Sequence, residues 1–233
     1  MLTTLAAGAS PEPDAARLCR VCAEVTGMTG AGIMLMSGDV LQGSICTSNG
    51  VSARIEELQF ELGEGPCVDA CQEGRPVLEP DLAAADASRW MAFATPAVEA
   101  GVRAIFGFPL QVGAVRLGAL NLYCDMPGAL SDDQHADALV MADVAAKAVL
   151  LMQADAPPGS LATELEAGSD FQYVVHQASG MVAAQLGVSV ADALVRLRAY
   201  AFGNDRPLPK VAADVVGRRL RFDAESAQMD PAP

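Results

Sequence analysis

The chain has 233 residues, 52% of them apolar, and a formal net charge of −14. An apolar fraction this high excludes a disordered chain and allows one sizeable core with a smaller one beside it. The charge is unevenly distributed along the chain. Residues 1–169 hold 8 basic and 22 acidic residues, whereas residues 170–222 hold 7 basic and 4 acidic ones. The first part is therefore excluded as a binding surface for polyanions, while the second part could bind them.

The first ten residues, MLTTLAAGAS, lack the basic segment and the long apolar segment of a signal peptide. The most apolar stretches, 104–123 and 138–152, are interrupted by proline or by charged residues, so neither is expected to span a membrane. We therefore expect a cytoplasmic protein with no membrane partner. Its six cysteines are expected to be reduced thiols rather than a disulfide framework.

Residues 14–26 have apolar side chains at helical spacing, which predicts an opening helix. Two apolar runs, 31–36 and 40–48, are separated by a glycine-bearing turn and predict a hairpin. Glycines at 63, 65 and 74 then bracket a short predicted helix that precedes a strand at 76–79. Residues 88–102 are predicted to form a further helix that ends at Gly101.

The segments 103–112 and 116–125 are joined by Gly-Ala-Val and are predicted to form the longest hairpin and the central strands. Ser131 and Gln134 have the spacing of a capping box, so a long helix is predicted to follow. Five strands linked mostly by hairpins, with helices at both ends, predict an α+β domain over residues 14–153, built on one antiparallel sheet.

Prolines and a glycine at 154–160 predict a linker, which we extend to residue 169. From Asp170 the pattern changes to three short helices with no strand signal. The second of these helices begins at Ser189, and the third begins at the prolines near residue 208. A small all-α domain is therefore predicted over residues 170–222, followed by a disordered tail at 223–233.

The carboxyl-terminal segment closely resembles the ANTAR family, which are three-helix RNA-binding modules of bacterial antitermination regulators. The resemblance lies in Gln177, Ala178, Gly180, Met181, Gly187, Val188, Ser189, Ala193, Leu197, Tyr200, Ala201, Val211, Ala212, Val215 and Val216. Ser179 stands where that family often has a lysine, so one phosphate contact is missing. The resemblance implies that the module binds paired hairpins in nascent transcripts and prevents transcription termination.

Residues 14–153 resemble a GAF domain, a PAS-like sheet flanked by helices that is found fused to such modules. The matching stretches are LGEGPCVDA, GRPVLEPDL, RW, GVRAIFGFPL, LGALNLYCD and GALSDDQ. The resemblance implies a sensor domain with a pocket for an unidentified small molecule. The aromatic residues expected to line that pocket are Phe60, Trp90, Phe93, Phe106, Phe108 and Tyr123.

Basic and polar residues of the last segment are the candidates for RNA contact, because cations that neutralise phosphates make binding strong and salt-dependent. Lys210 and Arg221 are expected three turns apart on one face of the third helix. The full candidate set is Gln177, Arg196, Arg198, Tyr200, Arg206, Lys210, Arg218, Arg219 and Arg221.

Two other functions remain open from the sequence. Cys67 lies near a helix start, where a thiolate is favoured, as in a GAF-type reductase of free methionine sulfoxide. A DNA-binding helix-turn-helix is the second, although few residues follow Val216 to form its recognition helix. We expect no enzyme, no catalytic residue, no metal and no cofactor.

A homodimer is also expected, because the long helix after Ser131 carries a narrow seam of mostly small residues, Leu139, Ala142, Ala146 and Val149. A dimer would bind two adjacent hairpins more tightly through effective concentration.

Overall fold

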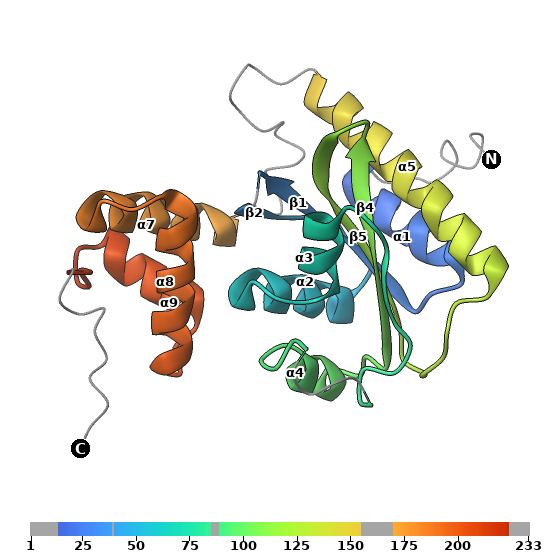
Figure 1. The fold of residues 1–233 in the computed structure, drawn as a ribbon, viewed down its shortest axis with the longest axis horizontal. Helices are drawn as coiled ribbons and strands as arrows, with labels where there is room; N and C mark the ends of the chain where they lie inside the picture. The colour runs from blue at the N-terminus through green and yellow to red at the C-terminus, as the bar shows by residue number, and fades with distance from the viewer. Residues whose placement is uncertain (1–13, 39, 85–88, 155–169, 224–233) are drawn as a thin grey trace.

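The computed structural model describes residues 14–38, 40–84, 89–154 and 170–223. Figure 1 shows a sheet flanked by helices and, beside it, a separate group of three helices at the carboxyl end. The antiparallel α+β domain and the three terminal helices are therefore both present. Apart from their first residues, the predicted linker at 154–169 and the predicted disordered tail at 223–233 lie outside the described residues.

The sheet has five antiparallel strands in the order β2–β1–β5–β4–β3. Both predicted hairpins are confirmed, and β5 lies at the centre because it pairs with both β1 and β4. The strands are β1 (Gly30–Ser37), β2 (Val40–Thr47), β3 (Val77–Glu79), β4 (Ala104–Val112) and β5 (Val115–Cys124).

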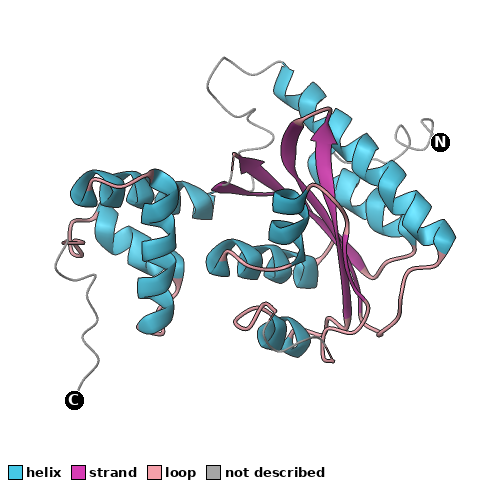
Figure 2. Ribbon diagram, in the orientation of Figure 1, coloured by secondary structure: helices cyan, strands magenta, loops and turns pink. Residues whose placement is uncertain are grey.

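Alternating side chains of the strands enter two cores on opposite faces of the sheet. One face is covered by α1 (Asp14–Thr26) and α5 (Asp132–Ala154), and the other by α2 (Gly50–Leu62) and α3 (Pro66–Glu73), as Figure 2 shows. The short α4 (Ala94–Glu99) joins the α2–α3 core through the fully buried Ala97.

The start of α5 confirms the predicted capping box. The backbone N–H of Gln134 donates to Ser131 Oγ at 3.2 Å, and the N–H of Ser131 donates to Gln134 Oε1 at 3.0 Å. The predicted dimer seam is wrong, however, because Ala142, Ala146 and Val149 are buried in the α1–α5 core. Their small side chains let α5 approach the protein's own sheet instead of a partner.

Helix α2 was not predicted from the sequence, although its ends are well defined. Asn49 Oδ1 accepts from the N–H of Ser52 at 2.9 Å, while Gly63 ends the helix in the left-handed conformation at φ 69°. The predicted helix at 88–102 is shorter than expected and begins only at Ala94. Trp90 has a φ of 55°, which is incompatible with a helix through that residue.

The carboxyl-terminal group contains α7 (Asp170–Leu186), α8 (Val190–Gly203) and α9 (Leu208–Val216). The predicted cap of α8 is confirmed, because the N–H of Asp192 donates to Ser189 Oγ at 3.0 Å. Helix α9 ends before the arginines, since Arg218 has a φ of 57°. The expectation that Lys210 and Arg221 share one helical face is therefore wrong.

The cysteines also differ from expectation. Cys19 of α1 and Cys46 of β2 form a disulfide with their Cα atoms 5.9 Å apart, because α1 packs directly over β2. Cys22, Cys67 and Cys71 are buried free thiols, and Cys124 is a half-buried one.

Among the described helices, none taken singly has the length and apolar character needed to cross a bilayer. The pair Tyr173–Leu186 and Val190–Gly203 meets the length and composition test only when joined, and it is bent by 105° at the break.

Candidate functional site

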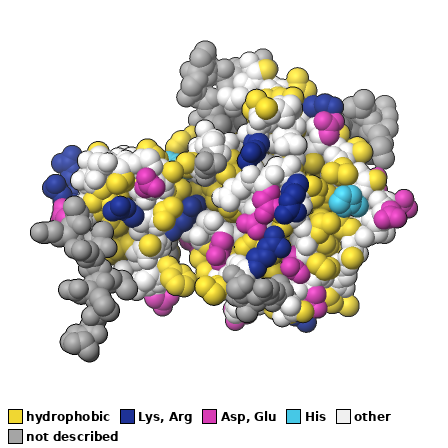
Figure 3. All heavy atoms as spheres, in the orientation of Figure 1, with side chains coloured by type: hydrophobic (Ala, Val, Ile, Leu, Met, Phe, Trp, Pro, Cys, Tyr) yellow, Lys and Arg dark blue, Asp and Glu magenta, His cyan; other side chains and the backbone are white. Residues whose placement is uncertain are grey.

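The candidate RNA-binding residues lie on the three carboxyl-terminal helices and in the segments between and after them. Figure 3 shows basic side chains at the end of this group away from the sheet and also near its boundary with the sheet-containing part. The exposed candidates are Gln177, Lys210, Arg218, Arg219 and Arg221, and the half-buried ones are Arg196, Arg198, Tyr200 and Arg206.

Part of this positive charge is neutralised inside the group. Asp214 of α9 forms ion pairs with Arg206 at 2.5 Å and with Arg219 at 2.7 Å. The bond from Arg206, and to a lesser extent that from Arg219, lowers the pKa of Asp214 below its usual value. Arg221 lies 3.4 Å from Asp223, and both side chains are well exposed. The two arginines on Asp214 are therefore weaker phosphate ligands than the sequence suggested.

Besides Arg198, three candidate cations have no acidic partner among the described residues: Arg196, Lys210 and Arg218. Tyr200, another member of the candidate set, lies edge-on to Phe222 with 5.5 Å between ring centroids. The described cationic surface thus depends on isolated lysine and arginine side chains more than on an aromatic platform.

Arg198 lies at the boundary with the sheet-containing part rather than on the outer surface. Its guanidinium donates two hydrogen bonds to the backbone C=O of Phe60 in α2, from Nε at 3.0 Å and from Nη2 at 2.6 Å. Burial lowers the pKa of Arg198 to about 10, so the group keeps its charge at neutral pH.

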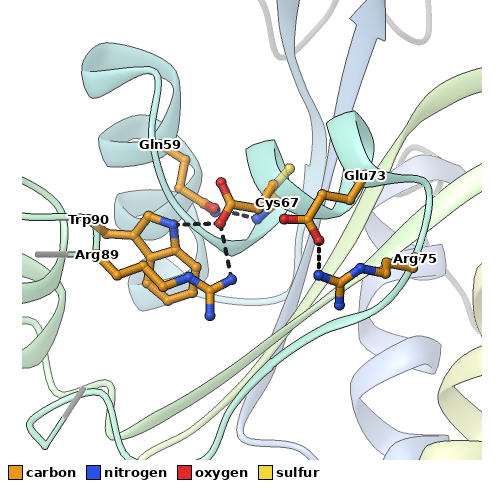
Figure 4. A network of polar contacts seen from close by, with 7 residues as sticks. Gln59, Cys67, Glu73, Arg75, Arg89 and Trp90 are labelled. Atoms are coloured by element: carbon orange, nitrogen blue, oxygen red, sulfur yellow. Dashed lines mark hydrogen bonds and ion pairs between the residues drawn. The ribbon is translucent and has the colours of Figure 1, made fainter. Parts of the chain in front are cut away.

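A buried polar cluster lies between α2 and the sheet, and sequence analysis did not predict it. Asn121 of β5 donates from Nδ2 to Glu56 Oε1 at 2.6 Å, and Gln59 Oε1 accepts from the backbone N–H of Cys67 at 2.8 Å. Figure 4 shows Gln59 reaching from α2 to Cys67 at the start of α3. Each of these side chains is almost completely buried.

Three polar atoms of this cluster have no hydrogen-bond partner among the described residues: Glu56 Oε2, Gln59 Nε2 and Asn121 Oδ1. Burial raises the pKa of Glu56 to about 8, and the hydrogen bond that Glu56 accepts from Asn121 offsets only part of this rise. The carboxyl group is therefore mainly protonated at neutral pH, and the cluster offers both donors and acceptors to a small polar molecule.

The cysteine thiols are poorly suited to nucleophilic chemistry. Burial raises the pKa of Cys67 well above its usual value, and the nearby Glu56 adds to this rise. Burial also raises the pKa of Cys71 to about 11 and that of Cys22 to about 12. Within the described part of the chain, no group of three His, Cys, Asp or Glu side chains is placed to hold a metal.

The six aromatic residues predicted to line a pocket do not lie together. Phe60, Trp90, Phe93 and Tyr123 belong to the α2–α3 core, whereas Phe106 and Phe108 belong to the α1–α5 core on the other face of the sheet. All six are buried. A single pocket therefore cannot be lined by the whole set, because the sheet separates its members.

Two acidic residues hold the segment before α4 against α3. Glu64 Oε1 accepts from the N–H groups of Ala92 and Phe93 at 2.7 and 2.8 Å. Asp69 Oδ2 accepts from Arg89 at 3.1 Å and from the indole N–H of Trp90 at 3.0 Å, the network drawn in Figure 4. These bonds fix the segment before α4 to α3 and to Glu64 shortly before it.

Comparison with known proteins matches the sheet-containing part to one family. The model of the GAF domain matches residues 15–149. No curated protein matches the chain at a significant level.

Several solved structures are similar to this chain. The GAF domain of a phosphoenolpyruvate-protein phosphotransferase from Acinetobacter is 14% identical with a TM-score of 0.51, covering 67% of this chain and 92% of that one. A GAF domain/HD domain protein from Geobacter sulfurreducens is 14% identical with a TM-score of 0.49, covering 65% and 100%. A type II free methionine-R-sulfoxide reductase from Thermoplasma acidophilum is 17% identical with a TM-score of 0.45, covering 57% and 86%. At 14% identity, the Acinetobacter structure shows a similar fold and nothing beyond it.

Proposed function

Because the chain belongs to the GAF domain family, we propose that it is a bacterial regulator in which this sensor domain controls RNA binding by helices α7, α8 and α9. The proposed target is a hairpin in a nascent transcript, and the proposed result is that transcription termination is prevented. The resemblance of residues 174–216 to the ANTAR family supports this proposal, as does the presence of three helices in that segment.

The single observation that carries the proposal is the reversal of charge along the chain. Residues 170–222 hold 7 basic and 4 acidic residues in a protein of net charge −14. Among the described side chains, Arg196, Lys210 and Arg218 remain unpaired with acidic groups. Such cations bind phosphates, and RNA is recognised mainly through folded shape and unpaired loop bases rather than through a major-groove code.

We propose that the signal acts at the buried polar cluster of Glu56, Gln59 and Asn121. Their unpartnered atoms present donors and acceptors within the sensor domain, so a small polar molecule is the ligand class that matches them.

The two rival functions have less support. A nucleophilic role for Cys67 requires a thiolate, and burial opposes its formation. A helix-turn-helix requires a recognition helix after α9, whereas the described residues 217–223 are not helical.

We also propose a homodimer. The dimer contact would be formed by exposed apolar residues of α5, such as Val140, which is 60% exposed, and Leu151, which is 72% exposed. These residues would replace the seam predicted from the sequence, which is mostly buried. Sedimentation equilibrium tests this part, and a monomer at every concentration with RNA bound would exclude it.

The direct test of RNA binding is a gel shift of the full chain with a two-hairpin transcript. The expected result is a complex that unlabelled hairpin RNA displaces and that duplex DNA of equal length displaces poorly. Equal displacement by the two competitors would indicate a nonspecific polyanion surface instead.

A further inference from the structure

The last turn of α2 is where the GAF domain meets the carboxyl-terminal helices. Phe60 lies in the last turn of α2, where backbone carbonyls point toward the end of the helix. Arg198 of α8 donates its two hydrogen bonds to the C=O of Phe60, and its guanidinium lies 5.7 Å from the centre of the Phe60 ring. A cation at this position also complements the negative end of the helix dipole.

A second polar contact joins the same two parts. Burial raises the pKa of Glu61, whereas the nearby backbone N–H of Leu208, the first residue of α9, lowers it. Helix α9 has no side-chain cap of its own at Pro207, so an acid of the GAF domain supplies its negative partner. The two helix ends are therefore complemented across the boundary, one by a cation and one by an anion.

A third contact comes from α7. His176 Nε2 lies 2.9 Å from the backbone oxygen of Gln42 in β2, within hydrogen-bond distance, and the edge of its ring packs against Phe60 with 5.9 Å between centroids. Each of the three helices thus contacts the GAF domain through at least one polar group.

Resting on the proposed RNA-binding function, we propose that this interdomain contact, formed by Phe60 and Glu61 with Arg198 and Leu208, holds the RNA-binding helices in an inhibited arrangement. The N–H groups of Arg198 that face Phe60 cannot donate to a phosphate at the same time. The contact also places α2 against the face of α8 that carries Arg198, so RNA can use that face only after the two parts separate.

The same helix connects this contact to the buried polar cluster. Glu56 and Gln59 lie within about one turn of Phe60 on α2, and they bind Asn121 and Cys67 inside the domain. A ligand that changes these bonds would shift the last turn of α2, which carries the groups that contact α8 and α9. Helix α2 is therefore the physical link between signal and RNA binding.

Glu61→Gln opens the contact from the sensor side without changing a candidate RNA ligand. Glu57→Gln is its matched control, because it removes the same charge from the same helix at a residue that pairs only with Arg54 in the described contacts. We expect Glu61→Gln to bind the two-hairpin RNA about two- to fivefold more tightly than Glu57→Gln, since a helix-end charge contributes about that factor. Small-angle X-ray scattering without RNA should show a larger radius for Glu61→Gln alone.

Gly63→Ala is the second opening variant. An added Cβ would lie 2.6 Å from Arg198 Nη1, whereas at Gly74, which ends α3 in the same left-handed conformation, the nearest atom is 3.7 Å away. Gly63→Ala should therefore bind RNA more tightly than the control Gly74→Ala.

If RNA binds but each variant equals its control, the inhibitory contact is refuted while the proposed function stands. If neither the wild type nor any variant binds RNA, the proposed function is wrong. The proposal of an inhibitory contact is then refuted as well, whatever radius the scattering gives.

Discussion

The buried carboxyl of Glu56 provides the sharpest prediction about the sensor domain. The change is Glu56→Gln, which keeps the shape of the side chain and the acceptor for Asn121 but removes the ionisable group. Because burial raises the pKa of Glu56 from 4.5 to about 8, the folded protein holds a proton there that the unfolded chain releases at lower pH.

The sign and size follow from the difference in proton binding. Below pH 4.5 both states are protonated, so Glu56 costs the fold nothing through ionisation. Between pH 4.5 and 8 only the unfolded chain ionises, and the free energy of unfolding of the wild type falls by about 1.4 kcal/mol per pH unit. The whole effect approaches about 5 kcal/mol, calculated from the shift of Glu56 to about 8.

Urea unfolding at pH 5, 6, 7 and 8 measures this difference. The stability of Glu56→Gln relative to the wild type should rise steadily with pH across that range, because the substituted protein lacks the titration. Parallel pH profiles for Glu56→Gln and the wild type would refute the buried, protonated carboxyl.

Three further predictions concern the disulfide and the basic surface. Cys19→Ser should lower the free energy of unfolding by about 3 kcal/mol for a sequence separation of 27, and a reductant should produce the same loss in the wild type; insensitivity to reductant would contradict the bond. Gly63→Ala should lower the melting temperature more than Gly74→Ala, because the added Cβ would lie 2.6 Å from Arg198 Nη1 at Gly63 but no closer than 3.7 Å to any atom at Gly74. Equal losses would mean that backbone strain alone explains both. Asp214→Asn should tighten RNA binding more than Asp205→Asn, since of these two aspartates only Asp214 pairs with arginines in the described contacts. Equal effects on RNA affinity would mean that only the change in net charge matters.

Much of the fold could be predicted because its signals are local. Hairpins at β1–β2 and β4–β5 have turn residues between apolar runs, and the caps at Ser131 and Ser189 were confirmed by their hydrogen bonds. The end of α9 was less predictable. The apolar pattern continues to Phe222, but Arg218 adopts the left-handed conformation and ends the helix. The backbone N–H groups of Arg219 and Leu220 then donate to the C=O of Asp214.

The candidate site was less predictable because it depends on contacts between distant segments. Glu56 and Gln59 are polar residues on a helix that pattern analysis missed, and only the fold brings them beside Asn121. The disulfide between Cys19 and Cys46 likewise requires α1 to lie over β2. Alternation along β4 could have shown that Phe106 and Phe108 face away from Ile105, and hence away from the polar cluster.

The central claim is that the unpaired cations of the terminal helices bind RNA phosphates in the full chain. The salt dependence of hairpin RNA binding tests it most directly, using the double substitution of Lys210 and Arg218 by alanine. Each lost phosphate contact should reduce the slope of log affinity against log salt by roughly 0.7, so the pair should reduce it by roughly 1.4. The control is the double substitution of Arg54 and Arg75 by alanine, two exposed cations of the GAF domain, which should leave the slope unchanged. Equal slopes for wild type and both double variants would contradict the account.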